Sequence, residues 1–347
     1  MATPREVEAM RRALELAICE DAPVGPNPRV GCVVVSPDGA SIAEGFHRGA
    51  GTDHAEVDAL RQAGGAARGA TAVVTLEPCN HTGRTPPCSE ALIAAGVERV
   101  VYAQADPHAI AAGGADRLRA ARIDVEAGVL SAEAAAINEP WTFAVTHGRP
   151  LVTWKAAASL DGRVAAADGS SRWISGEQSR EQVHDLRAEV GAIVVGTGTV
   201  IADDPQLTSR TARGGGPARQ PLRVVVGMRD IPPGSRVLDD AAETVHLRTH
   251  DPVEVVDSLH SREVRHVLLE GGPTLAAAFL GAGLVDRVVW YVAPVLLGAG
   301  FSAIDEFGVG TLAEAVRLSE VRIDQVGADA RIRGVVDHRG RLLAGPG

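Results

Sequence analysis

The chain has 347 residues, a net charge of −10 at pH 7, 45% hydrophobic residues and 22% charged residues. This composition is typical of a soluble globular protein, and about 100–200 residues per domain predicts two domains. The acidic balance argues against broad contact with nucleic acid or an anionic membrane, so we expect a small-molecule substrate.

The first residues are charged and amphipathic and lack the apolar segment of a signal peptide, and no stretch approaches the roughly 18 apolar residues of a membrane helix. We therefore expect a cytoplasmic protein with no membrane contact. All four cysteines, Cys19, Cys32, Cys79 and Cys88, lie within the first 88 residues of the chain. In this setting they are expected to be buried thiols or metal ligands rather than disulfides.

The first half alternates between apolar-periodic helices and short β-branched strands. The pattern predicts a layered α/β domain. In chain order we expect a helix over 5–18, strands at 30–35 and 41–45, a helix from about 54, a strand at 71–76, a helix near 88–95, a strand at 99–104, and a helix–strand pair ending at 129.

Turn residues at 146–151 predict a boundary, with one domain over 1–146 and a second over 150–347. A second alternation begins at 151. We expect further strands at 192–196, 222–227, 244–247, 265–270 and 286–294, helices near 176–188, 252–262 and 273–282, and a flexible loop at 212–221.

His54 and Glu56 stand one residue apart at the start of a predicted helix, and Cys79 and Cys88 are separated by eight residues. One imidazole and two thiolates form a three-ligand zinc set that leaves a position for water, the catalytic pattern. Zinc lowers the pKa of that water from about 15.7 to about 7, which provides hydroxide for deamination. Glu56 is free to carry the proton to the leaving ammonia. His-x-Glu followed by Pro-Cys-x-x-Cys is typical of zinc deaminases, and only the spacing of the second cysteine departs from it. Cys19 and Cys32 are expected in the core.

In the second half, "VGTGTVIADDPQLTSR" (195–210) and "LLEGGPTLAAAFL" (268–280) each place glycines between a predicted strand and a predicted helix. Free backbone N–H groups in such turns can bind phosphate. Neither segment is a Gly-x-Gly-x-x-Gly fingerprint or a Walker loop, so a tight strand–helix turn is the alternative.

The segments "GPNPRVGC", "AEGFHRGAGTDHAEVDAL" and "LEPCNHTGRTPPC" resemble the deaminase domain of the bifunctional deaminase–reductase family of riboflavin biosynthesis. "KAAASLDGR", "SRWIS", "HDLRAEVGAIVVGTGTVIADDPQLTSR", "LLEGGPTLAAAFL" and "VDRVVWYVAPVLLGAG" resemble its reductase domain, so the resemblance covers nearly the whole chain. It implies a cytidine-deaminase-like three-layer α/β/α domain followed by a dihydrofolate-reductase-like α/β domain.

The resemblance further implies the activities. The substrate would be 2,5-diamino-6-ribosylamino-4(3H)-pyrimidinone 5′-phosphate, which is deaminated at zinc before NADPH reduces its ribosyl group to ribityl. The cofactors would be Zn²⁺ and NADPH. Such enzymes are commonly homo-oligomers, dimers or tetramers, through the reductase domain.

Site residues are implied residue by residue. In the deaminase half, the zinc ligands are His54, Cys79 and Cys88, the proton carrier is Glu56, and the substrate residues are Asn27, His47, His81 and Arg84. In the reductase half, Lys155 and Asp203 are the catalytic residues. NADPH would be held by Ala157, Ala158, Trp173, Thr199, Asp203, Gly271 and Gly272, and the substrate by Ser171, Arg187, Leu207, Arg210 and Glu270.

The chain departs from the family pattern at two places. "DPHAIAAGGA" (106–115) has His108-Ala109 where the family usually has Asn-Pro, which affects the shape of this loop. Gly227-Met228 replaces a common Asp-Ser after a strand, which bears on the choice between NADPH and NADH. Arg223 and Arg229 could compensate at a 2′-phosphate, or could be ordinary surface arginines.

Two other functions remain open at the level of the residues. The chain could be a nucleoside or tRNA deaminase whose second half only positions substrate, although the acidic balance disfavours tRNA. Alternatively, the second half could be a nucleotide-sensing or oligomerisation module. Substrate-dependent NADPH oxidation distinguishes the reductase from both.

Overall fold

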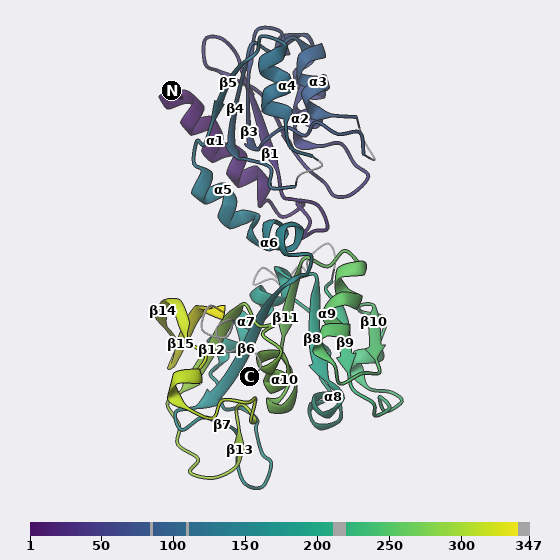
Figure 1. Cartoon of the computed structure of the whole chain (residues 1–347), viewed down its shortest axis with the longest axis vertical. Helices are drawn as coiled ribbons and strands as arrows, with labels where there is room; N and C mark the ends of the chain where they lie inside the picture. The colour runs from purple at the N-terminus through teal and green to yellow at the C-terminus, as the bar shows by residue number, and fades with distance from the viewer. Residues whose placement is uncertain (84–85, 109–110, 211–219, 339–347) are drawn as a thin grey trace. The chain divides into compact units, whose positions relative to one another are not determined.

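A computed structural model describes residues 1–83, 86–108, 111–210 and 220–338. The chain divides into two compact units, Met1–Gly148 and Arg149–Gly347 (Figure 1). Each unit contains its own central sheet and its own hydrophobic core.

The sheet of the first unit has the strand order β2-β1-β3-β4-β5. Its strands are β1 (Gly31–Val35), β2 (Ser41–Phe46), β3 (Thr71–Leu76), β4 (Arg99–Gln104) and β5 (Asp124–Ala127). β1 pairs antiparallel with β2 and β3, whereas β3, β4 and β5 run parallel. The carboxyl ends of β3 and β4 therefore lie at the same edge.

Helices cover both faces of this sheet, because its central strands β1, β3 and β4 are apolar on both sides. On one face, α1 (Pro4–Ala17) and α5 (Ser131–Ile137) pack against Val33, Val73 and Val101. On the other face, α2 (Ala55–Ala63), α3 (Cys88–Ala95) and α4 (Gly114–Ala120) pack against Cys32, Val34 and Val74. A short 3₁₀ helix, η1 (Gly64–Ala67), follows α2, and α6 (Glu139–His147) ends the unit. Figure 1 shows the resulting three layers.

Close packing of α2 on β2 depends on Gly45. A Cβ at this position would lie 2.4 Å from the carbonyl oxygen of Ala55 and 2.5 Å from the nitrogen of Ala59. No side chain fits there, so glycine allows the first turn of α2 to lie directly on the sheet. His54 and Glu56 belong to this turn.

The sheet of the second unit has eight strands in the order β10-β9-β8-β11-β6-β12-β15-β14. The six strands from β10 to β12 are parallel, and β15 and β14 add an antiparallel hairpin at one edge. The strands are β6 (Leu151–Ser159), β8 (Ala192–Gly196), β9 (Leu222–Val226), β10 (Thr244–Leu247), β11 (His266–Leu269), β12 (Arg287–Ala293), β14 (Leu318–Val326) and β15 (Asp329–Val336). β7 (Arg163–Ala165) and β13 (Phe301–Ser302) form a separate pair.

Helices again cover both faces. α9 (Pro252–Ser261) and α10 (Pro273–Gly281) pack on the face that carries Trp154 and Val224. α7 (Glu177–Ala188) and α8 (Thr197–Asp203) pack on the face that carries Ile193 and Val225. Two 3₁₀ helices, η2 (Arg236–Leu238) and η3 (Leu312–Glu314), lie in connecting segments. The α/β fold expected for each half is confirmed.

The named strands and helices are found where the sequence predicts them, within a few residues at their ends. The elements that were not predicted are α5, α6, β14 and β15, together with the short strands β7 and β13 and the three 3₁₀ helices. β14 is an edge strand, and most of its side chains are exposed. It therefore lacks the alternation of buried apolar and exposed polar residues by which a strand is recognised in a sequence. The predicted loop over 212–221 lies almost wholly outside the described residues, as does Ala109 in the 106–115 loop.

Candidate active sites

The structure brings His54, Cys79 and Cys88 together, and their ligand atoms all lie within 4.8 Å of one another. The Nδ1 atom of His54 is 3.6 Å from the Sγ atom of Cys79 and 3.2 Å from the Sγ atom of Cys88. In the described residues this is the one group of three or more potential ligands that is close enough to hold a metal.

Local structure places each ligand. His54 is the N-cap of α2, and Cys88 is the first residue of α3. Cys79 follows β3, and its Sγ atom accepts a hydrogen bond from the N–H of Cys88. Helix N-termini favour negative charge, so the N-terminus of α3, whose Cys88 N–H donates to the Sγ atom of Cys79, stabilises the ionised form of Cys79. The pKa of Cys79 is lowered to about 4, because the Cys88 thiol donates a hydrogen bond to it and His54 lies close by.

The donor set fits zinc. Bond lengths of about 2.1 Å to nitrogen and 2.3 Å to sulfur place tetrahedral ligands roughly 3.6–3.8 Å apart, close to the separations found here. A single imidazole with two thiols matches a catalytic site, in which the fourth position is open to water. The three ligands come from three segments that only the fold brings together.

Glu56 lies in the first turn of α2 and is buried. Burial raises the pKa of its carboxyl group, which forms a hydrogen bond with the Cys88 thiol. Glu56 therefore lies beside the ligand cluster without belonging to it. A buried carboxyl group with a raised pKa exchanges protons near neutral pH more readily than an exposed one.

Asn27 and His47 form a polar pair next to the cluster. The Nδ2 atom of Asn27 lies 2.9 Å from Nε2 of His47, and Nδ1 of His47 lies 3.1 Å from the carbonyl oxygen of Asp53. A carbonyl only accepts, so Nδ1 of His47 carries the proton and Nε2 accepts from Asn27. The rings of His47 and His54 meet edge to face at 5.2 Å between centroids. The carboxamide oxygen of Asn27 is thereby left for a ligand, since no described residue donates to it.

His81 lies in the segment between the two cysteines. Its Nδ1 atom is buried and has no hydrogen-bond partner among the described residues, which suits a substrate contact. Arg84 lies outside the described residues.

Sequence reasoning missed Asn138, which holds the Asn27 segment. Asn138 is buried between α5 and α6, its Oδ1 accepts from the N–H of Arg29 at 2.8 Å, and its Nδ2 donates to the carbonyl of Arg29 at 2.9 Å. A lone Asn between two helical segments carries no motif, so no sequence signal was available for this role.

In the second unit, three predicted residues meet at the carboxyl edge of the sheet. Lys155 on β6 is level with Glu270, which follows β11, and its Nζ lies 3.3 Å from Glu270 Oε2. Arg187 from α7 binds the same carboxylate through Nε at 2.6 Å and Nη2 at 2.9 Å. Burial alone would raise the pKa of Glu270, but Arg187 and Lys155 lower it to about 2.

The segment after α8 closes one side of this group. Thr208 accepts hydrogen bonds through its carbonyl oxygen from Arg187 Nη1 and His184 Nδ1, both at 3.2 Å. Leu207 has a φ of +53° while its side chain is buried in the core, so only its backbone can reach a ligand. Such a conformation is unfavourable for leucine and is frequent at functional sites. Arg210 follows, exposed and without an ion pair among the described residues. His184, one helical turn before Arg187, was also missed.

The residues expected to hold NADPH line the same edge. Gly272 is the N-cap of α10 and has no side-chain cap, and its Cβ position lies 3.8 Å from Thr199 Oγ1. The free backbone N–H groups at the start of α10, together with the Thr199 hydroxyl, suit the binding of a pyrophosphate. Ala157 shares a face of β6 with Lys155, whereas Ala158 is fully buried on the other face.

The remaining predicted residues are Trp173, Ser171 and Asp203. Trp173 is 69% exposed, and the guanidinium of Arg180 lies 4.6 Å from its ring centroid. Ser171 is half-buried two residues before it. Asp203 ends α8, and its carbonyl accepts a hydrogen bond from Arg172.

Arg223 does not take the role considered for it. It is fully buried on β9. Its guanidinium donates hydrogen bonds to the carboxylate of Asp239 and to the carbonyl oxygens of Gln206, Arg236 and Ala242. The expectation of either a phosphate contact or a surface arginine was therefore wrong, because the chain from 236 to 242 folds over it.

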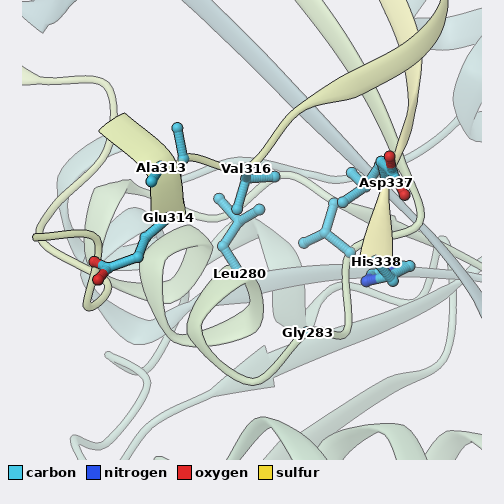
Figure 2. Close-up of a pocket in the computed structure, with 10 residues that line it drawn as sticks. Leu280, Gly283, Ala313, Glu314, Val316, Asp337 and His338 are labelled. Atoms are coloured by element: carbon cyan, nitrogen blue, oxygen red, sulfur yellow. The ribbon is translucent and has the colours of Figure 1, made fainter. Parts of the chain in front are cut away.

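A pocket in the second unit lies away from these residues (Figure 2). It is lined by the end of α10, η3 and the end of β15, with Leu280, Val316 and His338 among its residues. None of the predicted site residues lines it. In the described part of the chain, no helix is both long and apolar enough to cross a membrane.

Comparisons with known proteins agree with this geometry. Residues 4–104 match the family model of the cytidine and deoxycytidylate deaminase zinc-binding region, and residues 150–332 match that of the RibD C-terminal domain. The chain is 54% identical to the riboflavin biosynthesis protein RibD of Mycobacterium tuberculosis over 324 residues, which cover 93% of this chain and 95% of that protein. It is 41% identical to RibD of Escherichia coli, with 92% and 96% covered.

Two solved structures are similar over nearly their whole length. Acinetobacter baumannii RibD superimposes with a TM-score of 0.88 at 39% identity, covering 96% of this chain and 99% of that chain. A diaminohydroxyphosphoribosylaminopyrimidine deaminase/5-amino-6-(5-phosphoribosylamino)uracil reductase from Thermotoga maritima gives a TM-score of 0.82 at 32% identity, with the same coverage.

Proposed function

Because the chain belongs to the RibD family of bifunctional riboflavin-biosynthesis enzymes, we propose that it deaminates 2,5-diamino-6-ribosylamino-4(3H)-pyrimidinone 5′-phosphate and then reduces the ribosyl group of the product to ribityl. The chain is a zinc-dependent deaminase and an NADPH-dependent reductase. The observation that carries the substrate assignment is that both groups of side chains, the ligand cluster with Glu56 and the Lys155–Glu270–Arg187 group, are assembled in one chain.

We assign the deaminase roles as follows. His54, Cys79 and Cys88 hold zinc, which when bound makes hydroxide available at neutral pH. Glu56 accepts the proton of the attacking water and delivers it to the exocyclic nitrogen, which leaves as ammonia. Asn27 presents its free carboxamide oxygen to a donor on the pyrimidine, while His47 holds that amide in place. His81 and Arg84 complete the contacts to substrate.

In the reductase half, bound NADPH would supply the hydride for reduction at C1′ of the opened sugar. Lys155 donates a proton to the attached nitrogen, so that a C=N bond becomes a C–N bond with hydrogen added at both atoms. Glu270 keeps Lys155 and Arg187 in place as their shared counter-ion. Ser171 and Arg210 bind the substrate phosphate, with the Leu207 backbone beside them, and Asp203 lies near the reacting sugar. Ala157, Ala158, Trp173, Thr199, Gly271 and Gly272 hold the cofactor.

We assign the deaminase to residues 1–146 and the reductase to residues 150–347, which the matches to 4–104 and 150–332 support. We also propose that the enzyme acts in the cytoplasm as a homo-oligomer, a dimer or tetramer. The exposed Val321 and Ile323 on edge strand β14 support association through the reductase unit.

The test supplies the purified chain with the diaminopyrimidinone ribosylamine phosphate, with and without NADPH. We expect ammonia release without NADPH, and equimolar NADPH oxidation when the cofactor is added. Ammonia release with no NADPH consumption would refute the reductase assignment and would favour a deaminase whose second half serves another purpose.

A further inference from the structure

The segment that leads to Arg210 is held by side chains instead of by a neighbouring strand. Residues 207–209 are buried one after another. In the described part of the chain, no hydrogen bond between backbone groups holds residues 205–209. Buried backbone N–H and C=O groups need partners, so the side chains around this segment determine its position.

Two carbonyl groups of the segment are held by cationic or ring donors. Arg223 Nη1 donates to the carbonyl oxygen of Gln206 at 3.3 Å. Two residues further on, His184 Nδ1 and Arg187 Nη1 both donate to the carbonyl oxygen of Thr208 at 3.2 Å. Because that oxygen only accepts, Nδ1 of His184 carries its proton. Residues 206 and 208 are therefore fixed from β9 and from α7.

Gln220 holds the next residue by both of its backbone groups. The N–H of Ser209 donates to Oε1 of Gln220 at 2.8 Å, and the Ser209 hydroxyl donates to the same oxygen at 3.2 Å. In return, Nε2 of Gln220 donates to the carbonyl oxygen of Ser209 at 3.1 Å. A carboxamide suits this position because it offers an acceptor and a donor side by side, as a backbone partner in a sheet would.

These contacts fix the backbone from which Arg210 extends. Ser209 immediately precedes Arg210, whose side chain is exposed. Leu207 has a φ of +53°, which is unfavourable for leucine and persists only where the surrounding structure imposes it. A guanidinium binds phosphate through parallel N–H donors, so its affinity depends on where its backbone places it.

We propose that Gln220 and His184 are positioning residues of the reductase. Through Ser209 and Thr208 they hold Arg210 where its guanidinium reaches the phosphate of the pyrimidine substrate. This inference rests on the proposed function, in which Arg210 binds that phosphate. The two residues act on the substrate through the 208–209 backbone and have no part in binding NADPH.

The test follows NADPH oxidation by the full-length chain, with the deaminated ribosylamine compound as substrate. We expect Gln220→Ala to raise the KM for this compound about 10-fold, because three hydrogen bonds to Ser209 are lost. The kcat and the KM for NADPH should change less than about twofold. Gln220→Glu should raise the KM at least as much, since it sets a carboxylate oxygen against the carbonyl of Ser209.

A double variant shows whether Gln220 acts through Arg210. In a chain that carries Arg210→Ala, the further change Gln220→Ala should raise the KM for the compound less than about twofold, because the group that Gln220 positions is already absent. A full 10-fold rise in that background would overturn the inference. Equal rises in the KM for NADPH and for the compound would also overturn it, because they indicate a general loss of structure.

His184 gives a second, independent pair of variants. His184→Ala removes a donor to the carbonyl of Thr208 and should raise the KM for the compound, whereas His184→Asn, whose Nδ2 can donate in place of Nδ1, should restore most of the affinity. An unchanged KM in His184→Ala would overturn the role of His184. Gln178→Ala, an exposed change on α7, is the control and should alter none of these constants.

The proposed function can fail separately. If Arg210→Ala alone leaves the KM for the compound unchanged, the assignment of Arg210 to the substrate phosphate is wrong. If Arg210→Ala raises this KM and Gln220→Ala does not, the proposed function stands and only the positioning role is overturned.

Discussion

At the scale of single residues, Glu56 differs from its neighbours in the deaminase site by standing beside the ligand cluster without joining it. We predict that Glu56→Gln abolishes ammonia release, by at least about 100-fold, because the amide cannot carry a proton, while zinc stays bound. Ammonia release and metal content by atomic absorption check this.

The matching control is Cys88→Ala, which removes a ligand and should lose the metal together with the activity. If Glu56→Gln also loses zinc, the carboxyl group has a ligating or structural role instead of proton transfer.

Glu270 is the residue that ties the stability of the reductase unit to pH. Its folded-state pKa is about 2 and its ordinary value is 4.5, so its stabilisation is complete above 4.5 and is lost as the pH falls toward 2. The difference corresponds to about 3 kcal/mol. We predict that urea unfolding, followed by tryptophan fluorescence, shows a loss of stability over this range. Three of the four tryptophans, Trp154, Trp173 and Trp290, lie in this unit.

Glu270→Gln should unfold at lower urea at neutral pH, because Arg187 and Lys155 lose their buried partner, and should show a flatter pH dependence between 4.5 and 2. Glu181→Gln, an exposed change on α7, serves as control. An undiminished pH dependence in Glu270→Gln would assign the acid sensitivity to other carboxylates.

At the scale of elements, residues outside the sites hold the site segments in place. Asp329, the first residue of β15, accepts hydrogen bonds from the N–H of Gly176 at 2.8 Å and from Ser179 Oγ at 2.6 Å. It thereby caps α7 from a distant hairpin. α7 carries His184 and Arg187, so the antiparallel hairpin helps to position the substrate side of the reductase.

The junction of α5 and α6 holds a site segment in place in the deaminase unit, because Asn138 at this junction binds the backbone of Arg29. We predict that Asn138→Ala raises KM for deamination more than it lowers kcat, because the segment that carries Asn27 loses both hydrogen bonds at Arg29. The free energy of unfolding of this unit should fall by about 1–3 kcal/mol, because the backbone N–H and C=O groups of Arg29 lose their hydrogen-bond partners. Steady-state kinetics and urea unfolding measure the two effects.

Thr146→Ala, an exposed change on α6, should alter neither quantity. Zinc content should stay unchanged in Asn138→Ala. A fall in kcat with no change in KM would show that Asn138 acts on the chemistry and not through the placement of Asn27.

At the scale of the whole molecule, the metal ligands and the Lys155–Glu270–Arg187 group belong to different units. We predict that removing zinc with a chelator abolishes ammonia release and leaves NADPH oxidation intact when the deaminated compound is supplied. Re-addition of zinc should restore the first activity. Loss of both activities on chelation would show that the reductase unit depends on the metal.

The sequence alone determined the class of each half, because its signals are local. The helix and strand periods, the His-Ala-Glu triplet and the two cysteines are visible over short stretches, and the named elements are confirmed. The three-ligand zinc set was likewise readable from residue types, although its spacing departs from the general deaminase pattern.

Only the tertiary structure decided which atoms of these residues are free. Arg187 is bound to Glu270, Arg223 is buried beneath the 236–242 segment, and Arg229 is unpaired among the described residues, yet all three are arginines in similar sequence surroundings. Asn138, His184 and Asp329 act through partners 24 to 153 residues away along the chain. Such roles depend on contacts made when distant segments meet, and a hydrogen-bond partner far along the chain leaves no periodicity for a sequence to reveal.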